Sequence, residues 1–354
     1  MNLPSRLLNV SVRMSILKYS CVRTLYYLPM YILVIPVVIF IVLKGLLRHG
    51  PCWLFYKKER LERPACMDDP QLGNHKFVQV KDIKLHIVES GDPKNPLMLF
   101  LHGFPECWYS WRHQIRTFNK DYHCVAIDMR GVGESDGPPG KMNYTCDLIT
   151  GDVCELIHVL GHETCILIGH DWGGLIGWKF AAQYPEMVDK YIAMNIPHPD
   201  RFNELVSLYL PQIIKSWYIF FFQMPWFPER GVQMGDYNMI NEECKHGETT
   251  DEDIEAFKYS ISRPDRLHTF MNYYRNELTL IFTKTGVVKT PTLLIWGTGD
   301  DYLHTRLSYD TEKFCPNLKV ERIEGGNHFI QQEQPDLVNQ LMKKYLEKEI
   351  TLEI

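Results

Sequence analysis

Two acidic residues and a histidine occur in a fixed order along the chain, each in a glycine-containing turn. Asp171 stands in the sequence Gly-His-Asp-Trp-Gly-Gly at 169–174, directly after the apolar run 165–168. This is the spacing of a nucleophile elbow, where small neighbours allow a sharp turn that exposes the central side chain above a sheet. Asp300 follows another apolar run, and His328 stands in a late Gly-Gly-Asn-His sequence. We therefore predict that Asp171 is a nucleophile and His328 a general base oriented by Asp300.

Two further assignments depend on neighbouring residues. Asp301 lies next to Asp300; the spacing Trp-Gly-Thr-Gly-Asp favours Asp300, with Asp301 as the alternative. Phe104 lies in a His-Gly-Phe-Pro turn after an apolar run, and Trp172 follows the proposed nucleophile. Because backbone N–H groups at these two places can face a reacting oxygen, we expect Phe104 and Trp172 to form an oxyanion hole.

Ser135 is a competing candidate nucleophile, since the sequence 133–137 reads Gly-Glu-Ser-Asp-Gly. Pro138 and Pro139 follow at once, however, where an elbow requires a helix. We expect Ser135 to be a loop residue without a catalytic role.

Predicted strands and helices alternate along the chain, and these elements must position the candidate residues. Five runs are apolar at nearly every position, which is typical of strands buried on both faces of a parallel sheet. They cover 97–101, 124–127, 165–168, 191–194 and 292–296. Alternating segments at 77–80 and 84–88 predict a hairpin, and amphipathic segments at 147–160 and 175–184 predict helices. The pattern predicts an α/β fold with a mostly parallel sheet, and the strand-free interval after 194 predicts an inserted helical cap.

The N-terminal region differs from the rest, because 25–43 contains no charged residue. As a helix this stretch would span about 28 Å, close to the hydrocarbon thickness of a bilayer. We expect a retained anchor that contacts the lipid bilayer through 25–43, since the run is too long for a signal peptide. Basic residues flank both sides, so the orientation stays open. The expected segments are an N-terminal segment 1–24, a transmembrane anchor 25–47, a linker 48–74, a first core part 75–197, a helical cap 198–288 and a second core part 289–354.

Composition excludes several classes of protein. The 354 residues are 45% hydrophobic and 23% charged, which is ordinary for a globular chain and excludes a disordered one. The net charge of -5 gives no basic surface for nucleic acid. The ten cysteines include no Cys-x-x-Cys pair, so we expect no metal site, and no motif indicates a cofactor.

Six segments together resemble the epoxide hydrolases of the α/β-hydrolase superfamily, and the N-terminal run resembles their membrane-anchored members. The segments are HGFPECWYSWRHQ (102–114), DMRGVGESD (128–136), GHDWGG (169–174), NYYRNE (272–277), WGTGDDYL (296–303) and GGNH (325–328). The resemblance covers the chain from about residue 75 onward and implies an α/β-hydrolase fold with an inserted helical cap. In this family two cap tyrosines hold the epoxide oxygen. Tyr274, in Tyr-Arg-Asn, matches one; Tyr218, before Phe222 and Gln223, is a weaker match to the other.

The resemblance implies conversion of an epoxide to a vicinal diol through an ester on Asp171. The residue types agree with this chemistry: an ionised carboxylate attacks without a base, tyrosines can protonate the alkoxide, and an ester can be hydrolysed where serine would leave an ether. A haloalkane dehalogenase, which uses the same fold and an aspartate nucleophile, is one alternative. A membrane-anchored binding protein with a vestigial triad is another.

The expected partners are a small-molecule epoxide and water, and an anchor beside an aromatic cap favours an apolar or lipid-derived epoxide. We expect a single-pass protein of the endoplasmic reticulum membrane. The particular epoxide and the oligomeric state stay open. Asn143 begins an Asn-Tyr-Thr sequon, which is meaningful only if the catalytic part is lumenal.

Overall fold

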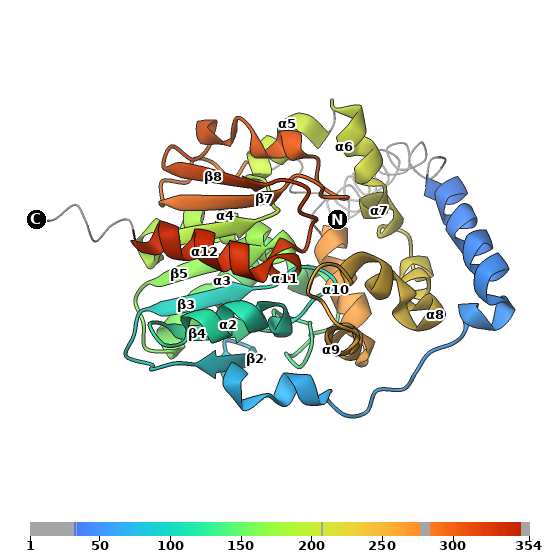
Figure 1. Ribbon diagram of the computed structural model, residues 1–354, viewed down its shortest axis with the longest axis horizontal. Helices are drawn as coiled ribbons and strands as arrows, with labels where there is room; N and C mark the ends of the chain where they lie inside the picture. The colour runs from blue at the N-terminus through green and yellow to red at the C-terminus, as the bar shows by residue number, and fades with distance from the viewer. Residues whose placement is uncertain (1–31, 33, 207, 277–283, 348–354) are drawn as a thin grey trace, which may run out of the picture.

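An eight-stranded sheet forms the centre of the molecule (Figure 1). The computed structural model describes residues 32, 34–206, 208–276 and 284–347. The strand order is β1-β2-β4-β3-β5-β6-β7-β8, with antiparallel pairing of β1 with β2 and of β2 with β4, and parallel pairing elsewhere. The strands are β1 (Asn74–Val80), β2 (Ile83–Ser90), β3 (Leu97–Leu101), β4 (His123–Ile127), β5 (Cys165–His170), β6 (Val188–Met194), β7 (Thr292–Gly297) and β8 (Leu318–Ile323).

The hairpin and the five apolar runs correspond to β1 through β7, which confirms the expected α/β fold with its mostly parallel sheet. The fully buried strands are the ones whose sequences are apolar throughout, as in β3 and β5. The sequence did not predict β8, whose residues LKVERI are half-buried except the last. An edge strand such as β8 is covered on fewer sides, so it lacks the continuous apolar run of a central strand.

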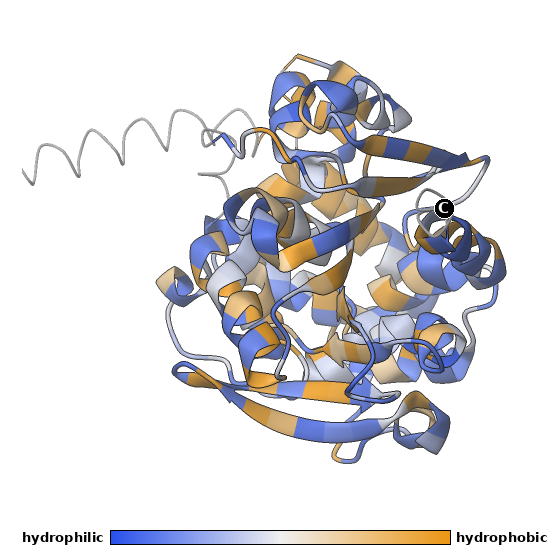
Figure 2. Ribbon diagram, turned by 90° about the vertical axis from the view of Figure 1, so that its left-hand side faces the viewer, coloured by the Kyte–Doolittle hydropathy of each residue, from blue (hydrophilic) through white to orange (hydrophobic). Residues whose placement is uncertain are grey.

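Helices cover both faces of the sheet. In Figure 1, α2 (Arg112–Phe118), α11 (Ile330–Glu333) and α12 (Pro335–Glu347) lie in front of the strands and contact one another. Behind the strands lie α3 (Cys146–Val159) and α4 (Asp171–Gln183), which also pack together. The helices carry hydrophilic and hydrophobic residues in alternating patches (Figure 2), as expected of helices that bury one side.

A helical insertion lies between β6 and β7, and its described residues contain no strand. Its helices are α5 (Pro199–Val206), α6 (Leu210–Lys215), α7 (Trp217–Phe221), α8 (Phe227–Cys244), α9 (Asp251–Ser262) and α10 (Arg266–Asn276). A kink interrupts α8, where Gly235, Asp236 and Tyr237 have φ angles of 60°, 60° and 59°. This cap lies between the sheet and the N-terminal helix in Figure 1.

The N-terminal helix, residues 34–49, is drawn in blue at the edge of Figure 1. One face is covered by protein, since Val34 is 1% and Val38 is 9% exposed, while Leu43 and Leu47 are 52% and 89% exposed. Part of the expected anchor, 25–31 and 33, lies outside the described residues. Among the residues that the structure describes, none of the helices combines the length and apolar character needed to cross a bilayer.

Candidate active site

Asp171 occupies a strained turn between β5 and α4. Its φ is 48°, a left-handed conformation that side chains other than glycine rarely adopt. Two glycines make the turn possible: a Cβ on Gly169 would come within 2.5 Å of the Gly173 carbonyl oxygen, and one on Gly173 would overlap the Leu101 carbonyl. The backbone at Asp171 is therefore locally strained, and this turn places the carboxylate above the ends of the strands.

The three residues of the expected triad lie together. His328 Nδ1 is 2.7 Å from Asp300 Oδ2, and His328 Nε2 is 3.6 Å from Asp171 Oδ2. Asp300 is 3% exposed, whereas its neighbour Asp301 is exposed to solvent. The structure thus places the carboxylate of Asp300, and not that of Asp301, against the imidazole.

Asn195 holds Asp300 in place and was not anticipated from the sequence. Its side-chain amide donates to Asp300 Oδ2 at 2.7 Å, and its Oδ1 accepts from the Gly297 N–H at 3.0 Å. The N–H groups of Tyr302 and Leu303 donate to the other carboxylate oxygen of Asp300. Asn195 directly follows β6 with a φ of 43°, so its place at the carboxyl end of a strand was the available signal.

The loop after β3 brings a backbone donor to the proposed nucleophile. The Phe104 N–H donates to Asp171 Oδ1 at 2.8 Å. Trp172 is the second residue of α4 and lies in its first turn, where N–H groups have no partner within the helix. Gly103 fits tightly here, because a Cβ would lie 2.5 Å from the Asp171 Cβ.

The two cap tyrosines, on α7 and α10, line the same cavity as Asp171. The ring centroids of Tyr218 and Tyr274 are 6.1 Å apart and the rings are nearly perpendicular at 82°. The residues that follow each tyrosine connect the two segments: the Gln223 amide donates to the Tyr274 carbonyl at 2.9 Å, and Arg275 donates to the Phe222 carbonyl at 3.1 Å. Burial, reinforced by the charge of Asp171, raises the pKa of both phenols well above the ordinary value, which keeps them protonated as donors.

Opposing effects set the charges of the triad. Burial alone would raise the pKa of Asp171, but the close contact with charged His328 and the hydrogen bond from the Phe104 N–H hold that pKa below the ordinary value. Burial alone would lower the pKa of His328, but the charge of Asp300, its hydrogen bond to the imidazole and the nearby Asp171 carboxylate raise it from 6.5 to about 10. In the free protein the imidazolium therefore lies between two carboxylates.

A second buried pair, His170 and Glu106, contacts the backbone of His328. His170 Nδ1 is 2.8 Å from Glu106 Oε2, and His170 Nε2 is 2.9 Å from the backbone oxygen of His328. Both side chains are inaccessible to solvent. The signal was present in the sequence, since Glu106 follows the His-Gly-Phe-Pro turn and His170 precedes Asp171.

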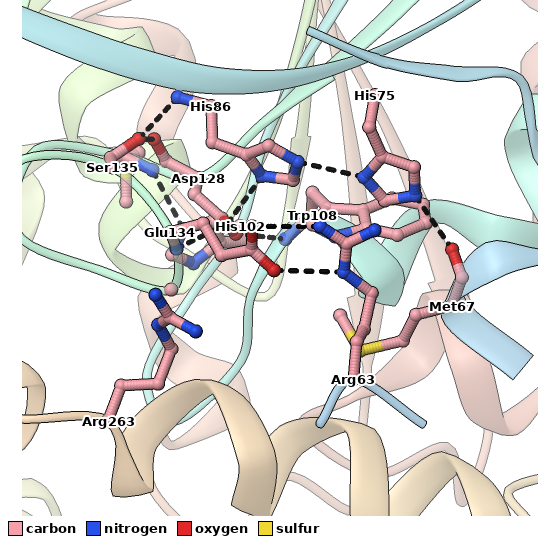
Figure 3. Close-up of polar contacts among 12 residues, drawn as sticks. Arg63, Met67, His75, His86, His102, Trp108, Asp128, Glu134, Ser135 and Arg263 are labelled. Atoms are coloured by element: carbon pink, nitrogen blue, oxygen red, sulfur yellow. Dashed lines mark hydrogen bonds and ion pairs between the residues drawn. The ribbon is translucent and has the colours of Figure 1, made fainter. Parts of the chain in front are cut away.

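Ser135 belongs to a separate buried network (Figure 3). Its hydroxyl donates to the Asp128 carbonyl at 2.5 Å and accepts from the His86 N–H at 2.8 Å. The Asp128 carboxylate contacts His86 Nδ1 at 2.8 Å, and His86 Nε2 contacts His75 Nδ1 at 2.8 Å. This network ties β1 and β2 to the loop after β4, and Ser135 is fully buried within it.

The active-site cavity has a volume of about 560 Å³. Asp171, His328, Tyr218, Tyr274 and Phe104 line its inner part, and residues from 38–49 of the N-terminal helix line its outer part. Within the described ranges, no group of three or more His, Cys, Asp and Glu side chains is arranged to hold a metal ion.

The sequence and the fold both match known proteins. Residues 96–335 match the family model for the alpha/beta hydrolase fold. Human epoxide hydrolase 4 is 41% identical over 315 residues, covering 86% of this chain and 87% of that protein. Epoxide hydrolase 1 of Caenorhabditis elegans is also 41% identical, covering 83% of this chain and 74% of that protein. The crystal structure of Bacillus megaterium epoxide hydrolase in complex with an inhibitor superimposes with a TM-score of 0.72 at 34% identity, covering 77% of this chain and 99% of that chain.

The sheet, the elbow and the inserted cap define an α/β-hydrolase. Within that superfamily, the chain belongs to the epoxide hydrolase family. The family expected from the six sequence segments is therefore confirmed, while the resemblance to its membrane-anchored members stays a prediction.

Proposed function

We propose that this protein hydrolyses an apolar or lipid-derived epoxide to a vicinal diol through a covalent ester on Asp171. One observation supports the proposal most directly. A carboxylate, an imidazole and two phenols line one cavity, and His328 Nε2 is 3.6 Å from Asp171 Oδ2. A nucleophile, a base and proton donors are the groups that the two half-reactions need.

In the first half-reaction, an oxygen of Asp171 attacks an epoxide carbon and the carbon–oxygen bond of the ring breaks. The lowered pKa of Asp171 supports this role, because the carboxylate is ionised without a base. The developing alkoxide takes a proton from Tyr274 or Tyr218, whose raised pKa values keep them protonated. The product is an ester, which removes the negative charge of Asp171.

Loss of that charge prepares His328 for the second half-reaction. Asp171 contributes to the raised pKa of His328, so ester formation lowers that pKa and the imidazolium returns a proton to the phenolate. Neutral His328, oriented by Asp300, then removes a proton from water that attacks the ester carbonyl. The Phe104 N–H already donates to Asp171 Oδ1, the oxygen that becomes the oxyanion. The proton on His328 passes to the departing diol oxygen, and the acid formed on Asp171 reprotonates His328.

The direct test is a panel of apolar epoxides and haloalkanes offered to the purified full chain in detergent. We expect diol formation that is lost in Asp171→Ala. Release of halide from haloalkanes without diol formation from any epoxide would contradict the proposal, and would favour dehalogenation instead.

The second part of the proposal is that the protein is a single-pass protein of the endoplasmic reticulum membrane. The uncharged stretch 25–43 supports an anchor, and so do the exposed apolar residues of the N-terminal helix, such as Ile39 at 52% and Leu43 at 52% exposure. Extraction of cell membranes with alkaline carbonate should leave the protein in the pellet. Recovery in the supernatant would contradict the anchor.

Asn143 reports the orientation of the catalytic part. The residue is half-buried and its side-chain nitrogen donates to the Pro139 carbonyl at 2.5 Å. A glycan at this nitrogen would have to replace that contact, and it would mark a lumenal catalytic part. The measurement is a shift in apparent mass on glycosidase treatment, with Asn143→Gln as the control.

A further inference from the structure

The outer wall of the active-site cavity comes from the N-terminal helix, far from the catalytic residues in sequence. Val38, Ile41, Val42 and Gly45 of this helix line the cavity that also contains Asp171. Val42 packs against the core cluster, and Val38 is only 9% exposed. Residues spaced four apart lie on one face of a helix, so this face is turned to the cap and the cavity.

Trp53 fixes the N-terminal helix to the cap. Its ring fills the space beside Gly45, where a Cβ would overlap it, and also the space beside Gly235 in the kink of α8. The indole stacks on His49 with ring centroids 5.7 Å apart. A side chain larger than hydrogen at either glycine would push the helix away from the cap.

The chain after Trp53 holds the kink itself. Asp236 has a φ of 60°, a left-handed conformation that is unfavourable for a residue with a side chain. Arg60 makes two hydrogen bonds to the Asp236 carboxylate, at 2.7 and 2.6 Å, and the Lys58 N–H adds a third at 3.0 Å. The Asp236 N–H donates to the Tyr56 carbonyl at 3.0 Å. These contacts make the segment after the helix a fixed part of the cap.

The cavity as a whole is lined mainly by apolar surface, although Lys44 and Arg48 of the N-terminal helix also line it. Opposite the helix, Phe221 of α7 and Met239 of α8 line the cavity. Both elements belong to the cap, and Tyr218 of α7 lies at the inner end beside Asp171. A substituent on the epoxide would therefore extend from Asp171 between the cap and the N-terminal helix.

We propose that the N-terminal helix is a specificity-determining wall of the active site, which contacts the part of an epoxide remote from its ring. This rests on the proposed epoxide hydrolysis. The helix then has two functions, with one face toward substrate and the other, which includes Ile39 and Leu43, exposed and apolar. A helix that served only as an anchor would tolerate changes on the cavity face as well as on the exposed face.

Two isoleucines on this helix provide a matched test. Both are partly exposed, Ile39 at 52% and Ile41 at 39%, but only Ile41 lines the cavity. The variants are Ile41→Trp and Ile39→Trp, each assayed with styrene oxide and with a long terminal alkyl epoxide such as 1,2-epoxyhexadecane. The readout is the ratio of kcat/KM for the long substrate to kcat/KM for the short one.

We expect Ile41→Trp to lower this ratio about tenfold or more, mainly through KM, because the larger ring occupies the space of the alkyl chain. Ile39→Trp should keep the wild-type ratio. Equal ratios in the two variants would overturn the proposal. If Ile41→Trp does not fold, Ile41→Ala serves instead: a wider cavity should raise the ratio for a long epoxide with a bulky terminal group, and an unchanged ratio would again overturn it.

The two proposals fail differently. If the wild-type protein hydrolyses neither epoxide, the proposed function is wrong. If it hydrolyses both and the ratio is insensitive to residue 41, only the role of the helix is wrong.

Discussion

At the scale of residues, the site is built around the charge of one carboxylate. Asp171 and Asp300 could be placed from the sequence because each follows a predicted strand of a parallel sheet, and such strands end at one edge. His328 was placed by its late Gly-Gly-Asn-His sequence, since the strand before it was not predicted. The choice between Asp300 and Asp301 needed the structure. Asn195 escaped prediction, because a single asparagine after a strand has no motif and its partner Asp300 is remote in sequence.

The first prediction concerns His328→Gln. Without a base the variant should still form the ester on Asp171 but hydrolyse it at least about 10² times more slowly. Intact-mass spectra after rapid mixing should show an adduct of substrate mass on most of the protein. Asp301→Asn, a change at the exposed neighbouring carboxylate, should turn over like the wild type. Absence of any adduct in His328→Gln would count against the covalent mechanism.

The second prediction concerns Asn195 as a positioning residue. Asn195→Ala removes one donor from Asp300 and leaves the Gly297 N–H without its acceptor. Loss of a hydrogen bond to a charged group costs about 1.5–3 kcal/mol, so hydrolysis of the ester should slow by about 10- to 100-fold. Formation of the ester should change less, since it does not need Asp300 to orient a base. Pre-steady-state kinetics separate the two steps; equal losses in both steps would indicate a general structural defect.

At the scale of elements, burial decided what could be predicted. Central strands such as β5 are apolar at every position, whereas β8 is half-buried and mixes charged with apolar residues. The cap was predictable as helical but not in its packing. The place of the N-terminal helix in the cavity wall depends on contacts such as Trp53 with Gly235, which join segments far apart in sequence and leave no periodic signal.

The third prediction concerns the two tyrosine-bearing helices. Tyr218→Phe and Tyr274→Phe each remove one donor to the epoxide oxygen, at a cost of about 2.7–4 kcal/mol or 10²–10³ in the rate of ester formation. The double variant should be nearly inactive, and hydrolysis of a preformed ester should change little. Tyr273→Phe is the matched control, because the Tyr273 hydroxyl donates to the Arg130 carbonyl at 2.7 Å and does not line the cavity. If the double variant forms the ester at the wild-type rate, the tyrosines line the cavity but do not act as proton donors.

At the scale of the whole molecule, the charges in the active site contribute to stability. The pKa of His328 rises from 6.5 to about 10 on folding, so the folded protein holds this proton more tightly than the unfolded chain does. The resulting stabilisation is complete below pH 6.5 and is lost as the pH rises towards 10.

The fourth prediction follows from that direction. Between pH 6.5 and pH 10, the thermal midpoint of the wild type should fall more than that of His328→Gln, since only the wild type loses this contribution. Other titrating groups are common to both proteins, so their effect cancels when the two thermal midpoints are subtracted at each pH. Parallel pH profiles would show that the imidazolium between Asp171 and Asp300 is absent from the folded state.

The central claim is that water attacks an ester on Asp171 and never the epoxide itself. A single turnover in water enriched in ¹⁸O, with enzyme in excess over epoxide, tests it directly. We predict one ¹⁸O atom in the peptide that contains Asp171 and an unlabelled diol, because the new diol oxygen comes from the carboxylate. A labelled diol with no label in that peptide would contradict the mechanism.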